Sequence, residues 1–446
     1  MILAATMAIL SQASSVSLTN LKAGDIYRYP VISVRGETQS ESLTIGLTED
    51  DQRPVKIVNG KFIGLIELKP GANSLLVKSG GQTVKTKVFY QPMKTPYKVH
   101  AIWYVSTDEG NDYPYAKPGE KQRLNEKMDT MLKMMQTFTA EAMDSAGYGK
   151  KTFALDTDKN GKVVVTIVKA NKTGAELRAQ DGGKTWADGY DIIKKTFDES
   201  TQKYAALMAF SRWDTTAKKG LGSFALGGGA QAMMYGGTVS LYPNSIAEVQ
   251  DAFLDTEFID PAKTYEDSAY RKTRWGNVST AYGAFLHELG HTFGLPHCAD
   301  RFGIMSRGFD HFNRRFMLTE PPVYGQEKGA DFGPDQISRW DSFHAARLNC
   351  SPWFQPDGKN GGEFDRSNPP TITVDGDKII IQSTRGIRTA GAELDDKFPY
   401  FKEYKITAPK TVTFSLDELR REIKSDKKVR VTAIDSEGNQ ADKEVG

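Results

Sequence analysis

Three of the six histidines of this 446-residue chain lie in one short stretch, HELGHTFGLPH (287–297). His287 and His291 are four residues apart, so on a helix both project from one face, about 6 Å apart along the axis. Two imidazoles placed in this way can each reach one cation at about 2.0–2.1 Å, the usual distance between zinc and nitrogen. The spacing therefore predicts that both histidines bind the same metal ion.

The residues that follow predict a third ligand from outside the helix. Gly294 is suited to end the helix, because glycine takes the left-handed C-cap conformation at little cost. Pro296 stiffens the returning chain, so that His297 can approach the same metal. Three neutral nitrogens leave a four-coordinate zinc with one open position, which is typical of catalytic rather than structural sites.

Glu288 supplies the remaining chemistry. It follows His287 directly and points about 100° around the helix from it, away from the metal itself. A water molecule in the open position would lose its proton easily, because zinc lowers its pKa towards neutrality. A carboxylate beside it serves as general base and later returns the proton to a departing amine. The stretch therefore predicts peptide-bond hydrolysis with one catalytic Zn²⁺, although other divalent ions would fit the same nitrogens.

The helix that carries these residues is predicted at about 280–293, with Ser279 as its N-cap. Around it, strands alternate with helices, which predicts an α/β layered domain. Strands are expected at 97–106, 205–213 and, as an edge strand, 237–243; helices are expected at 121–147, 189–203, 245–254 and 335–349.

Both ends of the chain have the pattern of small β-domains. Short runs rich in Val, Ile and Thr, separated by turn residues, predict an Ig-like β-sandwich at each end. The fold class is therefore multidomain α+β. The expected parts are a leader at 1–16, a β-sandwich at 17–94, a zinc peptidase domain at 97–354, a linker at 355–370 and a second β-sandwich at 371–446.

Composition and charge exclude some classes of function. The chain is 39% hydrophobic and 26% charged, with a net charge of +2 and no long block of one sign, so nucleic-acid binding is not expected. No apolar run is long enough to span a bilayer. The apolar stretch 2–10 resembles a secretory signal that lacks its basic region, or else a first strand. We expect a secreted or cell-envelope protein, with a cytoplasmic location as the alternative.

Two stretches together, HELGHTFGLPH and FGIMSRG (302–308), resemble the metzincin clan of zinc peptidases, whose pattern is HExxHxxGxxH followed by a Met-turn. The resemblance implies that Met305 lies beneath the metal as an apolar floor and is not a ligand. It also implies that the edge strand expected at 237–243 pairs with extended substrate. Its candidate residues are Thr238, Val239, Ser240 and Leu241.

A closer similarity is to a family of zinc metallopeptidases with an N-terminal β-domain. It is carried by GKFIGLIELKPGANSLLV, TPYKVHAIWYVSTD, GGTVSLYP, HELGHTFGLPH with GIMSRGFDHFNRRF, and RWDSFHAARLNCSPWF. The similarity covers roughly residues 25–354. Members of that family are usually described as intracellular, so the apolar leader of this chain leaves its location open.

The two cysteines depart from the metzincin pattern. Cys298 stands where many metzincins have Asp after the third histidine. Adjacent side chains on an extended segment point apart, so Cys298 is not expected to bind the metal that His297 reaches. Cys298 and Cys350 could form a disulfide in an exported protein; otherwise both are small buried residues.

The hypothesis that follows is a zinc-dependent endopeptidase acting on a protein or peptide substrate. The flanking β-domains would orient the enzyme or bind a further partner, since such folds serve many functions. Two alternatives stay open: a zinc-containing binding or adhesion protein without activity, and a zinc amidase acting on a non-protein substrate.

Overall fold

The computed structural model describes residues 16–355, 357 and 364–446. They fall into two compact units, Met1–Gln91 and Pro92–Gly446. The leader predicted at 1–16 lies outside the described residues except for Val16, as does part of the predicted linker. None of the helices in the described part of the chain combines the length and apolar character that a membrane crossing requires.

The first unit is built from two sheets. One has the strand order β1-β3-β7-β6 and the other the order β2-β9-β8-β4-β5. The strands are β1 (Val16–Leu18), β2 (Ile26–Tyr27), β3 (Val31–Thr38), β4 (Leu43–Gly46), β5 (Arg53–Pro54), β6 (Ile57–Val58), β7 (Lys61–Glu67), β8 (Gly71–Ser79) and β9 (Gln82–Tyr90). A Cβ added to Gly64 in β7 would lie 2.2 Å from Cδ1 of Ile45 in β4, so the two sheets pack face to face.

A mixed sheet forms the centre of the second unit, in the order β11-β10-β13-β17-β16, with β12 also paired to β10. Its strands are β10 (Lys98–Val105), β11 (Ala154–Leu155), β12 (Val165–Lys169), β13 (Gln202–Met208), β16 (Ala225–Gly228) and β17 (Gln231–Tyr235). All pairings are parallel except that of β16 with β17. The antiparallel strand β16 therefore forms one edge of the sheet.

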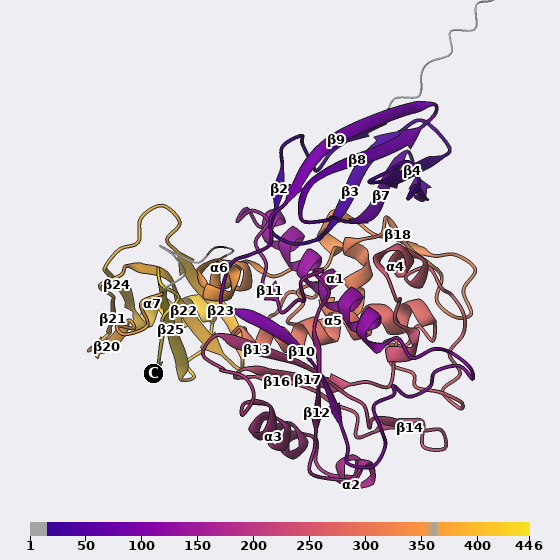
Figure 1. The fold of residues 1–446 in the computed structure, drawn as a ribbon. Coiled ribbons are helices and arrows are strands. Elements are labelled where there is room, and N and C mark those ends of the chain that lie inside the picture. Colours follow the sequence, from indigo (N-terminus) through magenta and orange to yellow (C-terminus); the bar gives the residue numbers. More distant parts are fainter. Residues whose placement is uncertain (1–15, 356, 358–363) are drawn as a thin grey trace, which may run out of the picture. The chain divides into compact units, whose positions relative to one another are not determined.

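Helices cover both faces of this sheet (Figure 1). α1 (Leu124–Ser145) and α5 (Arg274–Thr292) lie on one face, and α3 (Gly182–Ile193), preceded by α2 (Gly174–Ala179), lies on the other. Five methionines of α1 are fully buried: Met128, Met131, Met134, Met135 and Met143. Gly189 of α3 lies so close to Met233 of β17 that a Cβ would approach its Cε to 2.5 Å, so α3 packs tightly on the sheet.

The C-terminal residues form two further sheets inside the second unit, where the sequence predicted a separate domain. One sheet has the order β20-β21-β24 and the other the order β23-β22-β25-β26. The elements are β20 (Thr371–Asp375), β21 (Lys378–Gln382), β22 (Ile387–Leu394), β23 (Lys397–Glu403), β24 (Thr411–Ser415), α7 (Leu416–Ile423), β25 (Val429–Asp435) and β26 (Gln440–Val445). Side chains from both sheets and α7 share one apolar core.

Aromatic contacts join these sheets to the peptidase part. Phe343 of α6 (Ser342–Cys350) stacks on Phe398 of β23 with ring centroids 3.8 Å apart. The ring of Phe401 meets the same phenylalanine edge-on at 5.3 Å. Because this contact is apolar and buried on the α6 side, the C-terminal sheets form part of the same compact unit.

Several predicted elements differ from the structure. The helix predicted at 335–349 begins only at Ser342, as α6. The helix predicted at 189–203 starts earlier, as α3, because Asp181 caps its N-terminus and accepts from the N–H of Lys184. The helix predicted at 245–254 is a short 3-10 turn, Ile246–Glu248, followed by α4 (Val249–Ala252). The edge strand predicted at 237–243 is wrong: Val239–Leu241 is a 3-10 turn. Its N–H groups bond back to nearby carbonyls of the same segment, so they cannot join a sheet ladder.

Candidate metal centre

The helix α5 positions the first two histidines. The helix begins at Arg274, earlier than the predicted start at about residue 280. Its N-cap is Thr273, whose side chain accepts from the N–H of Gly276. Ser279 is instead a buried interior residue whose hydroxyl donates to the carbonyl of Asp310 at 2.9 Å. The helix ends as predicted at Gly294, which has a φ of +78°.

A Schellman motif makes the turn that brings the third histidine back. The N–H of Leu295 donates to the carbonyl of Gly290 at 3.1 Å, and the N–H of Gly294 donates to that of His291 at 2.9 Å. The chain reverses within these residues, and the structure brings His287, His291 and His297 together. One nitrogen from each ring lies within 4.8 Å of the other two.

The hydrogen bonds of two rings fix which nitrogen faces inward. Nδ1 of His287 donates to the carbonyl of Ile304, and Nδ1 of His291 donates to that of Leu295, each at 2.8 Å. A carbonyl can only accept, so each Nδ1 carries the proton and each Nε2 presents a lone pair. The two Nε2 atoms face each other 3.1 Å apart.

A metal ion fits this arrangement. Two lone pairs at that separation repel each other unless a cation lies between them. A proton is disfavoured in this role, because burial lowers the pKa of His287 to about 3 and lowers that of His291 as well. Three neutral imidazole nitrogens are a donor set that suits zinc, and copper, iron and nickel accept it too.

Glu288 is buried and lines a cavity together with His287. Burial raises the pKa of its carboxyl to about 7, although a hydrogen bond from the N–H of Gly227 acts in the opposite direction. Gly227 belongs to the edge strand β16, and a Cβ added to it would lie 2.0 Å from the carbonyl oxygen of Glu288. The edge strand therefore passes directly over the helix at the position of this carboxylate.

A cavity of about 320 Å³ opens at Glu288 and His287. Tyr235, Asp267 and Arg307 are among the residues that line it. The hydroxyl of Tyr235 donates to the Asp267 carboxylate, and Arg307 pairs with Asp310 at 2.6 Å. The metal-facing side of the helix thus opens on a space with polar walls.

Met305 is fully buried against the turn of α5 that carries His287 and His291. A Cβ added to Gly290, which lies between the two helical histidines, would meet Sδ of Met305 at 2.5 Å. The carbonyl of Met305 accepts from the N–H of Cys298 at 3.1 Å, which ties this segment to the chain after His297. Met305 therefore packs against the backbone that carries the histidines.

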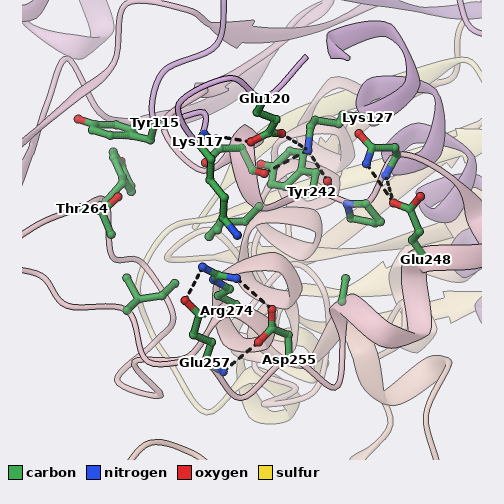
Figure 2. A pocket seen from close by; sticks show the side chains of 18 of the residues that line it. Tyr115, Lys117, Glu120, Lys127, Tyr242, Glu248, Asp255, Glu257, Thr264 and Arg274 are labelled. Carbon is green, nitrogen blue, oxygen red and sulfur yellow. Dashed lines mark hydrogen bonds and ion pairs between the residues drawn. The ribbon is translucent and has the colours of Figure 1, made fainter. Parts of the chain in front are cut away.

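The residues predicted to bind extended substrate are not at this cavity. Ser240 and Leu241 line a different cavity of about 770 Å³, which shares no lining residue with the first (Figure 2). There, the buried ammonium of Lys127 donates to the carbonyls of Ser240 and Tyr242 at 3.1 and 2.7 Å. Thr238 and Val239 are buried in the core. The exposed edge beside the histidines is β16, not 237–243.

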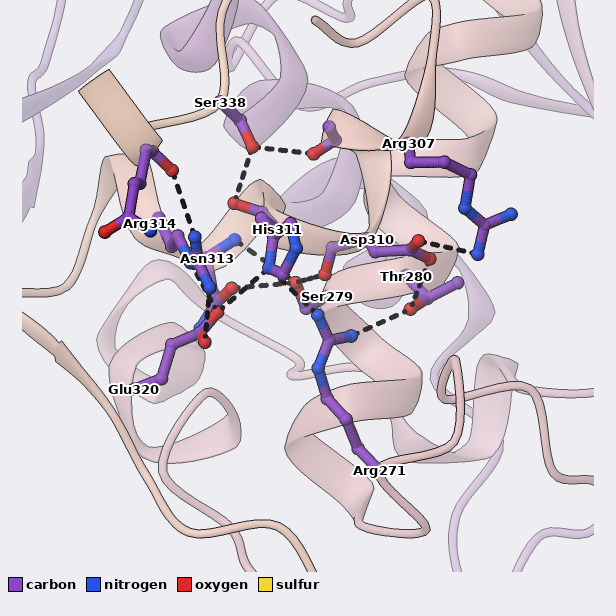
Figure 3. Close-up of polar contacts among 12 residues, drawn as sticks. Arg271, Ser279, Thr280, Arg307, Asp310, His311, Asn313, Arg314, Glu320 and Ser338 are labelled. Carbon is purple, nitrogen blue, oxygen red and sulfur yellow. Dashed lines mark hydrogen bonds and ion pairs between the residues drawn. The ribbon is translucent and has the colours of Figure 1, made fainter. Parts of the chain in front are cut away.

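A buried polar network holds the segment 302–315 against α5 (Figure 3). Arg314 makes two hydrogen bonds to the carboxylate of Glu320, both of 2.9 Å, and Nδ1 of His311 lies 3.3 Å from it. Burial acts to raise the pKa of Glu320, but the hydrogen bonds from His311 and Arg314 outweigh it and lower that pKa to about 2. His311 is therefore a structural residue of this network.

The two cysteines are separate thiols, so the possible disulfide between Cys298 and Cys350 is not formed. Cys298 lies with Asp341 and His344 in a second group of candidate ligands, directly behind the turn that carries His297. Burial raises the pKa of Cys298 to about 12, so its thiol stays protonated, and it lowers the pKa of His344 to about 3. Asp341 caps α6 by accepting from the N–H of His344 at 2.9 Å.

The sequence did not single out four residues that the structure places at this centre: Gly227, Tyr235, Arg307 and Asp396. The last accepts a hydrogen bond from Nδ1 of His297. A glycine pair in an edge strand was a usable signal for Gly227, because glycine allows close backbone approach. The others depend on contacts between distant parts of the chain.

Comparison with known proteins places the chain in a family. Residues 15–388 match the family Metallopep, described as "Putative peptidase family". The chain belongs to this family. The match spans the three histidines, Glu288 and Met305, and it ends inside β22.

Two curated relatives carry the description "Putative zinc metalloproteinase". The one from Schizosaccharomyces pombe is 28% identical over an alignment of 280 residues. This alignment covers 58% of this chain and 45% of the length of the relative. The one from Saccharomyces cerevisiae is 23% identical over an alignment of 387 residues. This alignment covers 77% of this chain and 55% of the length of the relative. This Metallopep member thus spans about half the length of either relative.

Solved structures overlap with this Metallopep chain more loosely. Wild-type OgpA from Akkermansia muciniphila covers 79% of this chain and 93% of its own at 17% identity, with a TM-score of 0.47. Catalytically inactive OgpA, solved with an O-glycopeptide substrate, overlaps with the same TM-score at 16% identity.

Proposed function

We propose that this chain is a zinc-dependent endopeptidase of the metzincin kind. His287, His291 and His297 hold the ion, Glu288 is the general base, and Met305 is the apolar floor of the site. The observation that carries the proposal is the pair of Nε2 lone pairs that face each other 3.1 Å apart, next to a buried carboxylate. Membership of a peptidase family supports it.

The residues of the chain have defined tasks in this reaction. A zinc ion held by the three imidazoles supplies Lewis-acid activation of a water molecule and of the scissile carbonyl. Glu288 accepts a proton from the attacking water and delivers it to the departing amine. The N–H of Gly227 orients the Glu288 carboxylate. The exposed edge of β16, rather than the segment 237–243, binds the substrate backbone as an added strand.

The direct test compares the wild-type protein with Glu288→Gln on a peptide library, with and without a chelator. Glutamine keeps the size of the side chain but cannot accept the proton, so we expect cleavage to fall at least about 100-fold. Zinc content should stay the same, because Glu288 is not a ligand. Glu327→Gln, at an exposed position in the same unit, is the matched control and should cleave at the wild-type rate.

Three outcomes would contradict the proposal. Cleavage by Glu288→Gln at the wild-type rate would remove Glu288 from the mechanism. Bound zinc without any peptide cleavage by the wild-type protein would favour an inactive binding protein. Cleavage of non-peptide amides alone would favour a zinc amidase.

A further inference from the structure

The third histidine differs from the other two in the partner of its Nδ1. His287 and His291 donate to backbone carbonyls of residues 304 and 295, which lie close to α5 in the fold. Nδ1 of His297 instead pairs with a carboxylate, that of Asp396. Asp396 lies 99 residues further along the chain, between β22 and β23 of the C-terminal sheets.

The tip of this hairpin is built to present that carboxylate. Leu394 and Lys397 are paired across the turn, so only Asp395 and Asp396 form the loop. Their φ angles are +50° and +59°, the left-handed conformation at both positions that a two-residue type I′ turn requires. Asn, Asp and Gly are the residues that favour such a turn, so Asp395 and Asp396 both suit it.

Backbone contact places the hairpin against the histidine loop as well. His297 and Lys397 form an isolated parallel β-bridge. The stack of Phe398 on Phe343 anchors the next residue of the hairpin to α6. Backbone, carboxylate and aromatic ring therefore act together to hold the hairpin tip at the loop that carries His297.

We infer that Asp396 is a positioning residue for the metal site, so that the C-terminal sheets complete the site that the first two histidines begin. This inference rests on the proposed zinc site. A carboxylate that accepts from Nδ1 fixes the tautomer and the ring orientation of a histidine, leaving Nε2 to bind the metal. Since Nδ1 and Nε2 lie on opposite sides of the ring, Asp396 faces away from the metal.

Both side chains are about half exposed, with 47% of His297 and 55% of Asp396 accessible to water. An exposed ion pair of this kind contributes little to the stability of the fold. It can still orient a ligand, because His297 comes from a loop and has no helix to fix its ring. Loss of Asp396 should therefore weaken zinc binding while the melting temperature changes by less than about 3 °C.

The experiment measures the zinc dissociation constant of the full chain by competition with a chromophoric chelator, using zinc alone. Asp396→Gly removes the carboxylate in a turn that favours glycine, and we expect a loss of affinity of about 10- to 100-fold. Asp395→Gly, which makes the same change at the neighbouring turn position, is the matched control. Asp395 pairs with Lys427 and not with a histidine, so its loss should change affinity less than about twofold.

A double-mutant cycle with His297→Ala separates positioning from a general structural effect. If Asp396 acts through the His297 ring, Asp396→Gly should have no further effect on zinc affinity in the His297→Ala background. Asp396→Asn keeps the turn and a hydrogen-bond acceptor without the charge, so its affinity should lie between wild type and Asp396→Gly. It also provides a folded variant if the glycine variant does not fold.

The results overturn different claims. Equal zinc affinity of wild type, Asp396→Gly and Asp396→Asn would refute the role of Asp396 and leave the three-histidine site intact. An equal loss in the presence and absence of His297 would show a structural effect and would also refute it. Failure of the wild-type chain to bind zinc, or full binding by His287→Ala, would overturn the proposed function and this inference together.

Discussion

At the residue scale, the orientation of three imidazoles decides the chemistry of the centre. Two of them expose Nε2 because backbone carbonyls hold Nδ1, and the third has a carboxylate in the same place. The buried Glu288 stands next in sequence to His287, with the N–H of Gly227 as its hydrogen-bond donor. In the proposed mechanism, separate neighbours therefore orient the ligands and the general base.

Gly227 provides a test at this scale. A methyl group at Gly227 would stand 2.0 Å from the carbonyl oxygen of Glu288, so Gly227→Ala must displace the edge strand from the helix. We expect kcat/KM for a cleaved peptide to fall about tenfold or more, because small misplacements of catalytic groups are costly. Zinc content should not change.

Gly228→Ala is the control, since a Cβ at Gly228 has no neighbouring atom within 4 Å. Steady-state kinetics of the two variants side by side give the answer. If both variants cleave equally well, the close approach of β16 to Glu288 has no part in the reaction.

At the scale of elements, α5 is held between the edge of the central sheet and the segment 302–315. The turn after Gly294 returns His297, and the polar network around Glu320 fixes the segment that contributes the Ile304 carbonyl and Met305 (Figure 3). The bidentate pair of Arg314 with Glu320 is buried, with only 6% of the glutamate exposed. A buried pair of this kind is costly to break.

The pH dependence of stability tests this network. The pKa of Glu320 is about 2 in the folded protein and 4.5 without these partners, so its contribution is present above pH 4.5 and is lost as pH falls towards 2. Glu320→Gln should lower the free energy of unfolding by about 3–5 kcal/mol at pH 7. Urea denaturation at pH 7, 5 and 3.5 should show this difference shrinking with acid, whereas a difference independent of pH would contradict the assignment.

The sequence predicts the parts of the site whose geometry is local, and it misses the parts that depend on distant contacts. The three histidines and Gly294 were predictable because their geometry is local: helical spacing and a C-cap decide it. Met305 was assigned only through the resemblance to the metzincin clan. The edge strand could not be predicted from the sequence, because the position of a strand in a sheet depends on pairings across the whole domain. The segment 237–243, which was expected there, instead contains a 3-10 turn. Asp396 could not be predicted either, since no pattern links it to a histidine 99 residues away.

At the scale of the whole molecule, the second unit combines peptidase elements and C-terminal sheets, and the candidate metal centre takes residues from both. The sequence predicted the C-terminal part as a separate module with its own role. Stacked phenylalanines join the C-terminal sheets to α6, and Lys397 of the hairpin forms a β-bridge with His297. The chain spans about half the length of its curated relatives.

Diffraction from crystals of the full chain grown with zinc, recorded on both sides of the zinc absorption edge, tests the central claim most directly. The account predicts an anomalous peak bonded to the Nε2 atoms of His287, His291 and His297, with Glu288 beside the open position and outside the ligand set. Absence of a peak among these rings, or a peak held instead by Cys298, Asp341 and His344, would contradict it.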